Sequence, residues 1–142
     1  MVNRQSLTAA IAVTLAAGFG AALAQDVTPD WGKREFESSC ASCHGSGGKG
    51  DGPLSRGYLS KAPTDLTVLA RKNGGVLPVS RLYAWIDGTA VGVHGTRDMP
   101  IWGTRYKLRA GEYYVDVEYD PQAYVRARVL SLIDYVDRLQ QR

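Results

Sequence analysis

Apolar residues recur most regularly near the end of the chain, where they are spaced three and four apart. The members of this stripe are Val125, Val129, Leu132, Ile133 and Val136. Such spacing places them along one face of a helix, which can pack against a core. Asp120 and Pro121 come directly before this segment, and they are typical of a helix cap followed by the first helical residue. The pattern therefore predicts a long amphipathic helix that begins at Pro121.

A shorter stripe follows residue 30. Gly32, Phe36 and Cys40 recur at a spacing of four, and this predicts a helix that ends near Cys40. Thr28 can cap this helix, with Pro29 as its first residue. We expect this segment to be the first helix of the folded part of the chain.

Glycine interrupts the sequence between these two helices. Residues 44–57 contain six glycines and are expected to form a loop. Residues 65–73 and 79–87 have helical character, and a glycine directly follows each segment. Residues 91–107 are again expected to form a loop. The chain is therefore predicted to be all-α, with about three to four short helices joined by long loops.

The first 24 residues have a different character. Arg4 precedes an uncharged, alanine-rich run from Leu7 to Ala24, which ends in the small-x-small pattern Ala22-Leu23-Ala24. We expect residues 1–24 to be a signal peptide and residues 25–142 to form one domain, exported to the periplasm. An uncleaved membrane anchor is the alternative, but Ala, Thr and Gly make this run only weakly hydrophobic.

Composition excludes two classes of protein. Of the 142 residues, 22% are charged and 44% are hydrophobic, which is typical of a globular domain and not of a disordered chain. The formal net charge is +3, and lysine and arginine are spread along the chain without a basic run. Nothing therefore indicates nucleic-acid binding. Short helices and glycine-rich loops form a poor core by themselves, so we expect an apolar group at the centre.

The segment Cys40-Ala41-Ser42-Cys43-His44 indicates which apolar group is expected at the centre of the fold. It is the C-x-x-C-H signature of c-type haem attachment. Each thiol adds to one vinyl group of the porphyrin, and two intervening residues let both thiols reach the same edge. His44 is then brought next to the iron as the proximal ligand. We predict one covalently attached haem c per chain, and we expect the loops to wrap around it.

Two other uses of this motif are less consistent with the sequence. A thioredoxin-like dithiol would follow a strand in a βαβ unit, which the pattern does not predict. A structural zinc site needs four ligands. The chain has four Cys and His side chains in total, and His94 lies fifty residues after His44. Both cysteines belong to the motif, so no disulfide framework competes for them.

A sixth ligand for the iron is expected from the segment after residue 91. Met99 is the only methionine besides Met1, and it lies 55 residues after His44, far enough for the chain to return on the opposite side of the haem. Pro100 holds the preceding residue in an extended conformation, which suits a loop that presents a side chain. We therefore predict that Met99 is the distal ligand. His94, five residues earlier, is the alternative.

The sequence resembles the class I cytochrome c family over about the whole of residues 25–142. Gly32, Phe36 and Cys40 resemble the N-terminal helix of that family. Leu132 and Tyr135 resemble its C-terminal helix, where an aromatic side chain packs against the N-terminal helix. The resemblance implies the cytochrome c fold, in which helices and long loops surround one haem.

Two loops carry the resemblance further. Gly52-Pro53-Leu54 resembles the loop after the haem motif, and the resemblance implies that the Pro53 carbonyl accepts a hydrogen bond from His44. Residues 99–103, Met-Pro-Ile-Trp-Gly, resemble the distal loop that supplies the axial methionine. Residues 105–119 are longer and richer in tyrosine than a minimal member needs. The part from Tyr113 to Tyr119 is compatible with a small hairpin or strand over the haem edge, or with a docking surface for a partner.

The resemblance also implies a function. An iron held by two protein ligands has no position for a small-molecule substrate, so we expect an electron carrier and not an enzyme. Its partners would be redox proteins, and it would meet membranes only through partner complexes. The alternative is a haem c subunit of a larger periplasmic or membrane-associated oxidoreductase. An enzyme or gas sensor with an open iron position is least favoured.

Overall fold

The computed structural model describes residues 28–90, 99–114 and 118–141. Its helices are α1 (Trp31–Ser39), α2 (Ala41–His44), α3 (Val79–Asp87), α4 (Trp102–Tyr113) and α5 (Pro121–Arg138). Short 3-10 turns lie between α2 and α3, at Pro53–Ser55, Leu66–Val68 and Arg71–Asn73. The described residues contain no strand, and the predicted all-α class is confirmed.

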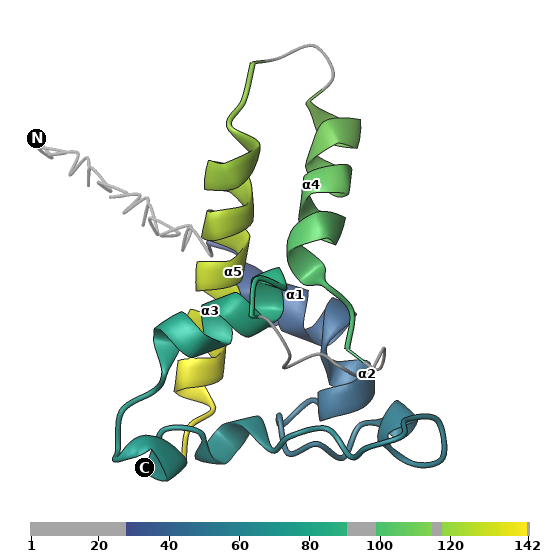
Figure 1. Ribbon diagram of the computed structural model, residues 1–142, viewed down its shortest axis with the longest axis vertical. Helices are drawn as coiled ribbons and strands as arrows, with labels where there is room; N and C mark the ends of the chain where they lie inside the picture. Colours follow the sequence, from purple (N-terminus) through teal and green to yellow (C-terminus); the bar gives the residue numbers. More distant parts are fainter. Residues whose placement is uncertain (1–27, 91–98, 115–117, 142) are drawn as a thin grey trace, which may run out of the picture.

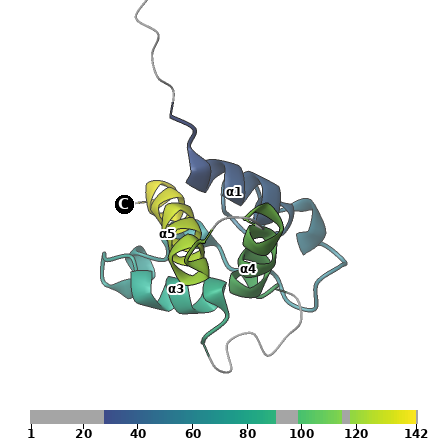
Figure 2. The same ribbon diagram turned by 90° about the horizontal axis from the view of Figure 1, so that it is seen from above.

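The helices pack around α5. α4 and α5 lie side by side and run in opposite directions, with the end of α4 and the start of α5 at one end of the molecule (Figure 1). α5 lies between α1 and α3 when the molecule is seen from above (Figure 2). Much of the segment 45–78 lies at the other end of the molecule, away from the end of α4 and the start of α5 (Figure 1). The arrangement leaves the haem motif, at the end of α1, next to those loops.

The core forms where these helices meet. Its buried members are Phe36, Leu69, Leu82, Ile86, Trp102, Tyr106, Val125, Val129, Leu132, Ile133 and Val136. All five apolar residues of the stripe predicted for the last helix belong to this core, so that prediction is confirmed. The helix predicted at residues 79–87 is also confirmed, with Leu82 and Ile86 buried and Gly88 at its end in the left-handed conformation.

α1 crosses α5 at very short range because Gly32 has no side chain. A Cβ atom at Gly32 would lie 2.0 Å from the carbonyl oxygen of Ser131. One turn later Phe36 is completely buried, and its ring centroid lies 5.2 Å from that of Tyr135. The helix contact that the family resemblance implied is therefore present.

The start of α1 differs from the prediction. Asp30, not Thr28, is the N-cap, and its Oδ1 accepts a hydrogen bond from the backbone N–H of Lys33 at 2.9 Å. Pro29 consequently lies before the helix instead of opening it. Asp30 also accepts a hydrogen bond from Arg138 of α5 at 2.6 Å. The Asp30 carboxylate thus caps the N-terminus of α1 and also forms an ion pair with Arg138 of α5. A threonine hydroxyl is uncharged and cannot form that ion pair.

Residues 65–73 form two 3-10 turns instead of the predicted single helix. In an α-helix the Ala70 N–H would bond to the Leu66 carbonyl. Here the side-chain amide of Gln140 forms hydrogen bonds with both the Ala70 N–H and the Leu66 carbonyl. Its Oε1 accepts from the Ala70 N–H at 2.9 Å, and its Nε2 donates to the Leu66 carbonyl at 2.7 Å. A residue seventy positions away therefore replaces the local helical bond.

The prediction that residues 91–107 form a loop is wrong for its last six residues, because α4 begins at Trp102. Trp102, Tyr106 and Ala110 are buried at a spacing of four, and they face the core. Charged residues between them, among them Arg105 and Lys107, conceal this stripe in the sequence. Residues 91–98 lie outside the described part of the chain.

The tyrosine-rich segment begins as helix and not as strand. Tyr113 is the last residue of α4. The rings of Tyr114 and Tyr119 lie 4.9 Å apart, and the ring of Tyr124 on α5 lies 6.0 Å from that of Tyr114. Residues 115–117 between them lie outside the described residues. Where the structure describes this segment, aromatic packing joins the ends of α4 and α5.

The predicted signal peptide, residues 1–24, lies outside the described residues. Among the helices in the described ranges, none combines the length and apolar character needed to cross a membrane.

Candidate functional site

The predicted attachment residues lie where α1 passes into α2. Cys40 ends α1 and begins α2, and the backbone N–H of His44 donates to the Cys40 carbonyl at 2.8 Å. This single turn holds Cys40, Cys43 and His44 in one rigid unit. Both cysteines are free thiols and half-buried. They are therefore available for two thioether bonds.

The Cys40 thiol lacks the lowered pKa of a redox-active cysteine. It packs against the apolar core. Burial, with smaller contributions from Glu35 and Cys43, raises its pKa to about 12. Redox-active cysteines have lowered pKa values, because the thiolate is the reactive form. The structure thus does not favour the thioredoxin-like alternative.

A zinc site finds no support in the part of the chain that the structure describes. Within those residues, no group of three or more Cys, His, Asp or Glu side chains is placed to hold a metal ion. His94, the remaining possible ligand, lies outside the described residues.

His44 is oriented to offer one nitrogen to a metal. Its Nδ1 lies 3.0 Å from the carbonyl oxygen of Thr64. A carbonyl only accepts hydrogen bonds, so Nδ1 carries the proton and Nε2 keeps its lone pair. Burial lowers the pKa of His44, which favours the neutral, ligating form. A neutral imidazole held by a backbone carbonyl is the usual state of a metal-bound histidine.

The acceptor for His44 differs from the one that the resemblance implied. The structure gives this hydrogen bond to Thr64 and not to Pro53. Pro53 opens a 3-10 turn, and Gly52 before it lies directly against the haem motif. A Cβ atom at Gly52 would lie 2.6 Å from the carbonyl oxygens of Ala41 and Ser42. The loop therefore does support the motif, but through the close backbone approach of Gly52.

Met99 lies three residues before α4 and is half-buried. It packs against the same apolar core as Cys40. The structure thus brings the attachment helix and the predicted distal residue to one cluster, although 59 positions separate them in the sequence. That Met99 binds the iron stays a prediction.

One feature near the site had no signal in the sequence. Glu35 is buried in α1, where it contacts Tyr106 of α4 and Arg128 of α5. The loop predicted at residues 91–107 gave Tyr106 no place in the core, and neither Glu35 nor Arg128 belongs to a predicted apolar stripe. Only the packing of three helices brings these side chains together.

The residues present fit a covalent haem. They supply two unpaired thiols in the attachment spacing, a histidine with a free Nε2 lone pair, and an apolar core that both Cys40 and Met99 contact. A c-type haem needs two thiols for thioether attachment, a nitrogen ligand for the iron and an apolar surface against the porphyrin.

Comparisons with known proteins agree with this assignment. A sequence model of the family described as Cytochrome c matches residues 30–106, which are more than half of the chain. No curated protein and no solved structure matches the chain. The matched range begins at the cap of α1, contains the haem motif and Met99, and ends at Tyr106. The chain therefore belongs to the cytochrome c family, whose members bind haem c covalently and transfer electrons.

Proposed function

We propose that this chain is a mono-haem cytochrome that carries single electrons between redox proteins in the periplasm. The observation that carries the proposal is the rigid Cys40–His44 turn, which combines two free thiols with an imidazole whose Nε2 is available. The bound haem supplies one-electron chemistry by alternating between ferric and ferrous iron. The protein supplies attachment, ligands and an apolar shell.

In this proposal His44 and Met99 are the axial ligands. Two protein ligands leave no coordination position for a substrate, so the site exchanges electrons without binding one. A thioether favours the ferrous state, and the potential is then high compared with that of a bis-histidine haem. The Thr64 carbonyl supports the same function, because it keeps the imidazole in one tautomer and one orientation.

Export completes the proposal. Residues 1–24 serve as a signal peptide, and residues 25–142 form the functional domain. The mature chain then has a formal charge of +2, because Arg4 is lost with the leader. Two haem propionates bring the total to about zero.

Haem attachment and redox competence are tested together by expressing the full chain with a haem-attachment system. We expect the denatured protein to retain haem, and the visible spectrum to change reversibly between oxidised and reduced forms. The double variant Cys40→Ala, Cys43→Ala should lose the haem and show little cooperative unfolding, because the core is then incomplete. A well-folded double variant without haem would show that haem is not part of the core.

A second candidate function is a haem subunit of a larger oxidoreductase. The observation that favours it is a groove of about 640 Å³ between α1, α4 and α5. Trp31 and Tyr113 line this groove, with 56% and 87% of their surfaces exposed. Exposed aromatic side chains are typical of protein interfaces.

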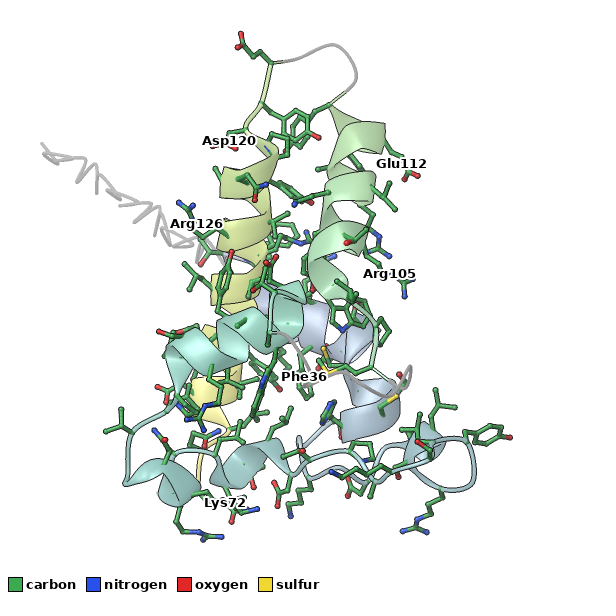
Figure 3. All side chains as sticks on the ribbon, in the orientation of Figure 1. Phe36, Lys72, Arg105, Glu112, Asp120 and Arg126 are labelled. Atoms are coloured by element: carbon green, nitrogen blue, oxygen red, sulfur yellow. The ribbon has the colours of Figure 1, made fainter. Side chains whose placement is uncertain are left out.

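The groove also has charged side chains, because Arg109 and Glu112 line it. Arg105 points away from α5 on the outer side of α4 (Figure 3). Gel filtration of the native protein, extracted from its own cells under mild conditions, separates the two functions. A monomer supports the carrier, and stable co-elution with a catalytic chain supports the subunit.

A further inference from the structure

Three helices meet at a polar cluster that consists of Glu35, Tyr106, Arg128 and Ser39, in which Glu35 and Tyr106 are buried and the other two are half-buried. Glu35 is 5% exposed and Tyr106 is 1% exposed. The Glu35 Oε1 atom accepts hydrogen bonds from the Tyr106 hydroxyl at 3.1 Å and from the Ser39 hydroxyl at 2.8 Å. Its Oε2 atom forms an ion pair with Arg128. The cluster therefore joins α1, α4 and α5 through one carboxylate.

Arg128 completes the cluster. Its guanidinium lies 5.5 Å from the ring centroid of Tyr106 and 5.6 Å from that of Tyr124. A buried carboxylate costs much free energy unless charged and polar partners surround it. Apolar residues of the same volume would give comparable stability, whereas a polar cluster is satisfied in only one arrangement of its helices. The property that this cluster adds is a defined relative position of α1, α4 and α5.

The position of the cluster relates it to the haem site. Glu35 lies five residues before Cys40 on the attachment helix, and Tyr106 lies seven residues after Met99. The Tyr106–Glu35 hydrogen bond is thus a direct side-chain link between the helix that carries the haem and the helix that follows the distal residue. Burial and the nearby Glu35 charge raise the pKa of Tyr106, so its hydroxyl keeps the proton that it donates.

The start of α4 has a second support on α3. A Cβ atom at Gly103 would lie 2.2 Å from the Oδ1 atom of Asp87 and 2.5 Å from its carbonyl oxygen. A Cβ atom at Gly88 would lie 2.2 Å from the side chain of Ile101. α4 is therefore held at its first turn by α3 and one turn later by α1. Met99 precedes both supports by a few residues.

We propose that Tyr106 is a positioning residue. Its hydrogen bond to Glu35 fixes the distance between Cys40 and the segment that contains Met99. Met99 needs this distance to bind the iron of the haem that is attached at Cys40. The inference rests on the proposed function, in which Met99 is the axial ligand. Ferric iron binds a soft thioether weakly compared with a nitrogen ligand. A small gain in freedom of α4 therefore lets an added nitrogen ligand replace Met99.

Two variants of the holoprotein separate positioning from general stability. Tyr106→Phe removes the hydroxyl that links α4 to Glu35 and leaves the ring in place. Ser39→Ala is the matched control, because it removes a hydroxyl that donates to the same Oε1 atom from within α1. Only the first variant loses a bond between helices.

The measurement is an imidazole titration of the ferric proteins, followed by the loss of the sulfur-to-iron absorption band. We expect Tyr106→Phe to bind imidazole roughly tenfold more tightly than the wild type, because a hydrogen bond to a charged acceptor is lost. Ser39→Ala should agree with the wild type to within about twofold, since the α1–α4 link is intact. Equal affinities for the wild type and Tyr106→Phe, or an equal gain in both variants, would overturn the inference.

Urea unfolding gives a second readout. Positioning predicts that Tyr106→Phe loses the sulfur band at a lower urea concentration than its helical circular dichroism. A variant in which both midpoints fall together has only lost stability, and that result contradicts the inference. Absence of the sulfur band from the wild-type protein would overturn the ligation by Met99 itself, and it is thus distinguishable from a failure of Tyr106 alone.

Discussion

The crossing of α1 and α5 gives the sharpest prediction for stability. Gly32→Ala would place a Cβ atom 2.0 Å from the Ser131 carbonyl oxygen and 2.8 Å from the Ser131 carbonyl carbon. Both are backbone atoms, so no side-chain rotation relieves the overlap. The helices must move apart by about 1 Å, and this separates Phe36 from Tyr135 in a close-packed core.

The size of the effect follows from two opposing terms. Overpacking of this kind destabilises by about 3 kcal/mol. Alanine is a better helix former than glycine by about 1 kcal/mol, which offsets part of the loss. We therefore expect the free energy of unfolding to fall by about 2 kcal/mol, and Tm to fall by roughly 6–10 °C for a domain of this size.

The assay is urea and thermal unfolding of the holoprotein, followed by circular dichroism. Gly111→Ala is the matched control, because Gly111 also lies within a helix but the nearest atom to its added Cβ is 3.9 Å away. That variant should be stabilised by about 0.5–1 kcal/mol. If Gly32→Ala is as stable as the wild type, α1 and α5 do not cross at the distance described.

Three further predictions concern the ligand, charge and pH. Met99→Ala should abolish the sulfur-to-iron band and lower the potential by on the order of 0.1 V, while His94→Ala should change both only a little, and the reverse result would assign the iron to His94. Electron exchange with the natural partner should depend weakly on salt, since the proposed mature chain with one haem is nearly neutral; a rate that falls several-fold between low and physiological ionic strength would reveal a concentrated charged patch. Hydrogen bonding from the Lys33 N–H, and then from Arg138, lowers the pKa of Asp30 below 3.8. The stabilising effect of the Asp30 carboxylate is therefore complete above pH 3.8 and is lost as the pH falls through the lowered pKa. The difference in Tm between the wild type and Asp30→Asn should then shrink below about pH 4. A difference in Tm that does not change with pH would contradict this role of Asp30.

The sequence by itself determined the features that depend on neighbours along the chain. The C-x-x-C-H motif indicates haem because attachment requires two thiols and a histidine in one turn. The apolar stripe of α5 predicts its buried face, because helical periodicity is local. The same holds for α3 and for the spacing of Gly32, Phe36 and Cys40 in α1.

Only the tertiary structure decided the features that depend on partners far away in the sequence. Gln140 breaks the helix expected at residues 65–73, because its amide replaces a local hydrogen bond. Thr64 and not Pro53 accepts the hydrogen bond of His44. α4 is stabilised because its buried residues Trp102, Tyr106 and Ala110 pack against the core beside α5. This packing brings the Tyr106 hydroxyl within hydrogen-bond distance of Glu35. Each of these contacts joins groups that only the folded chain brings together, and their spacing along the chain carries no record of it.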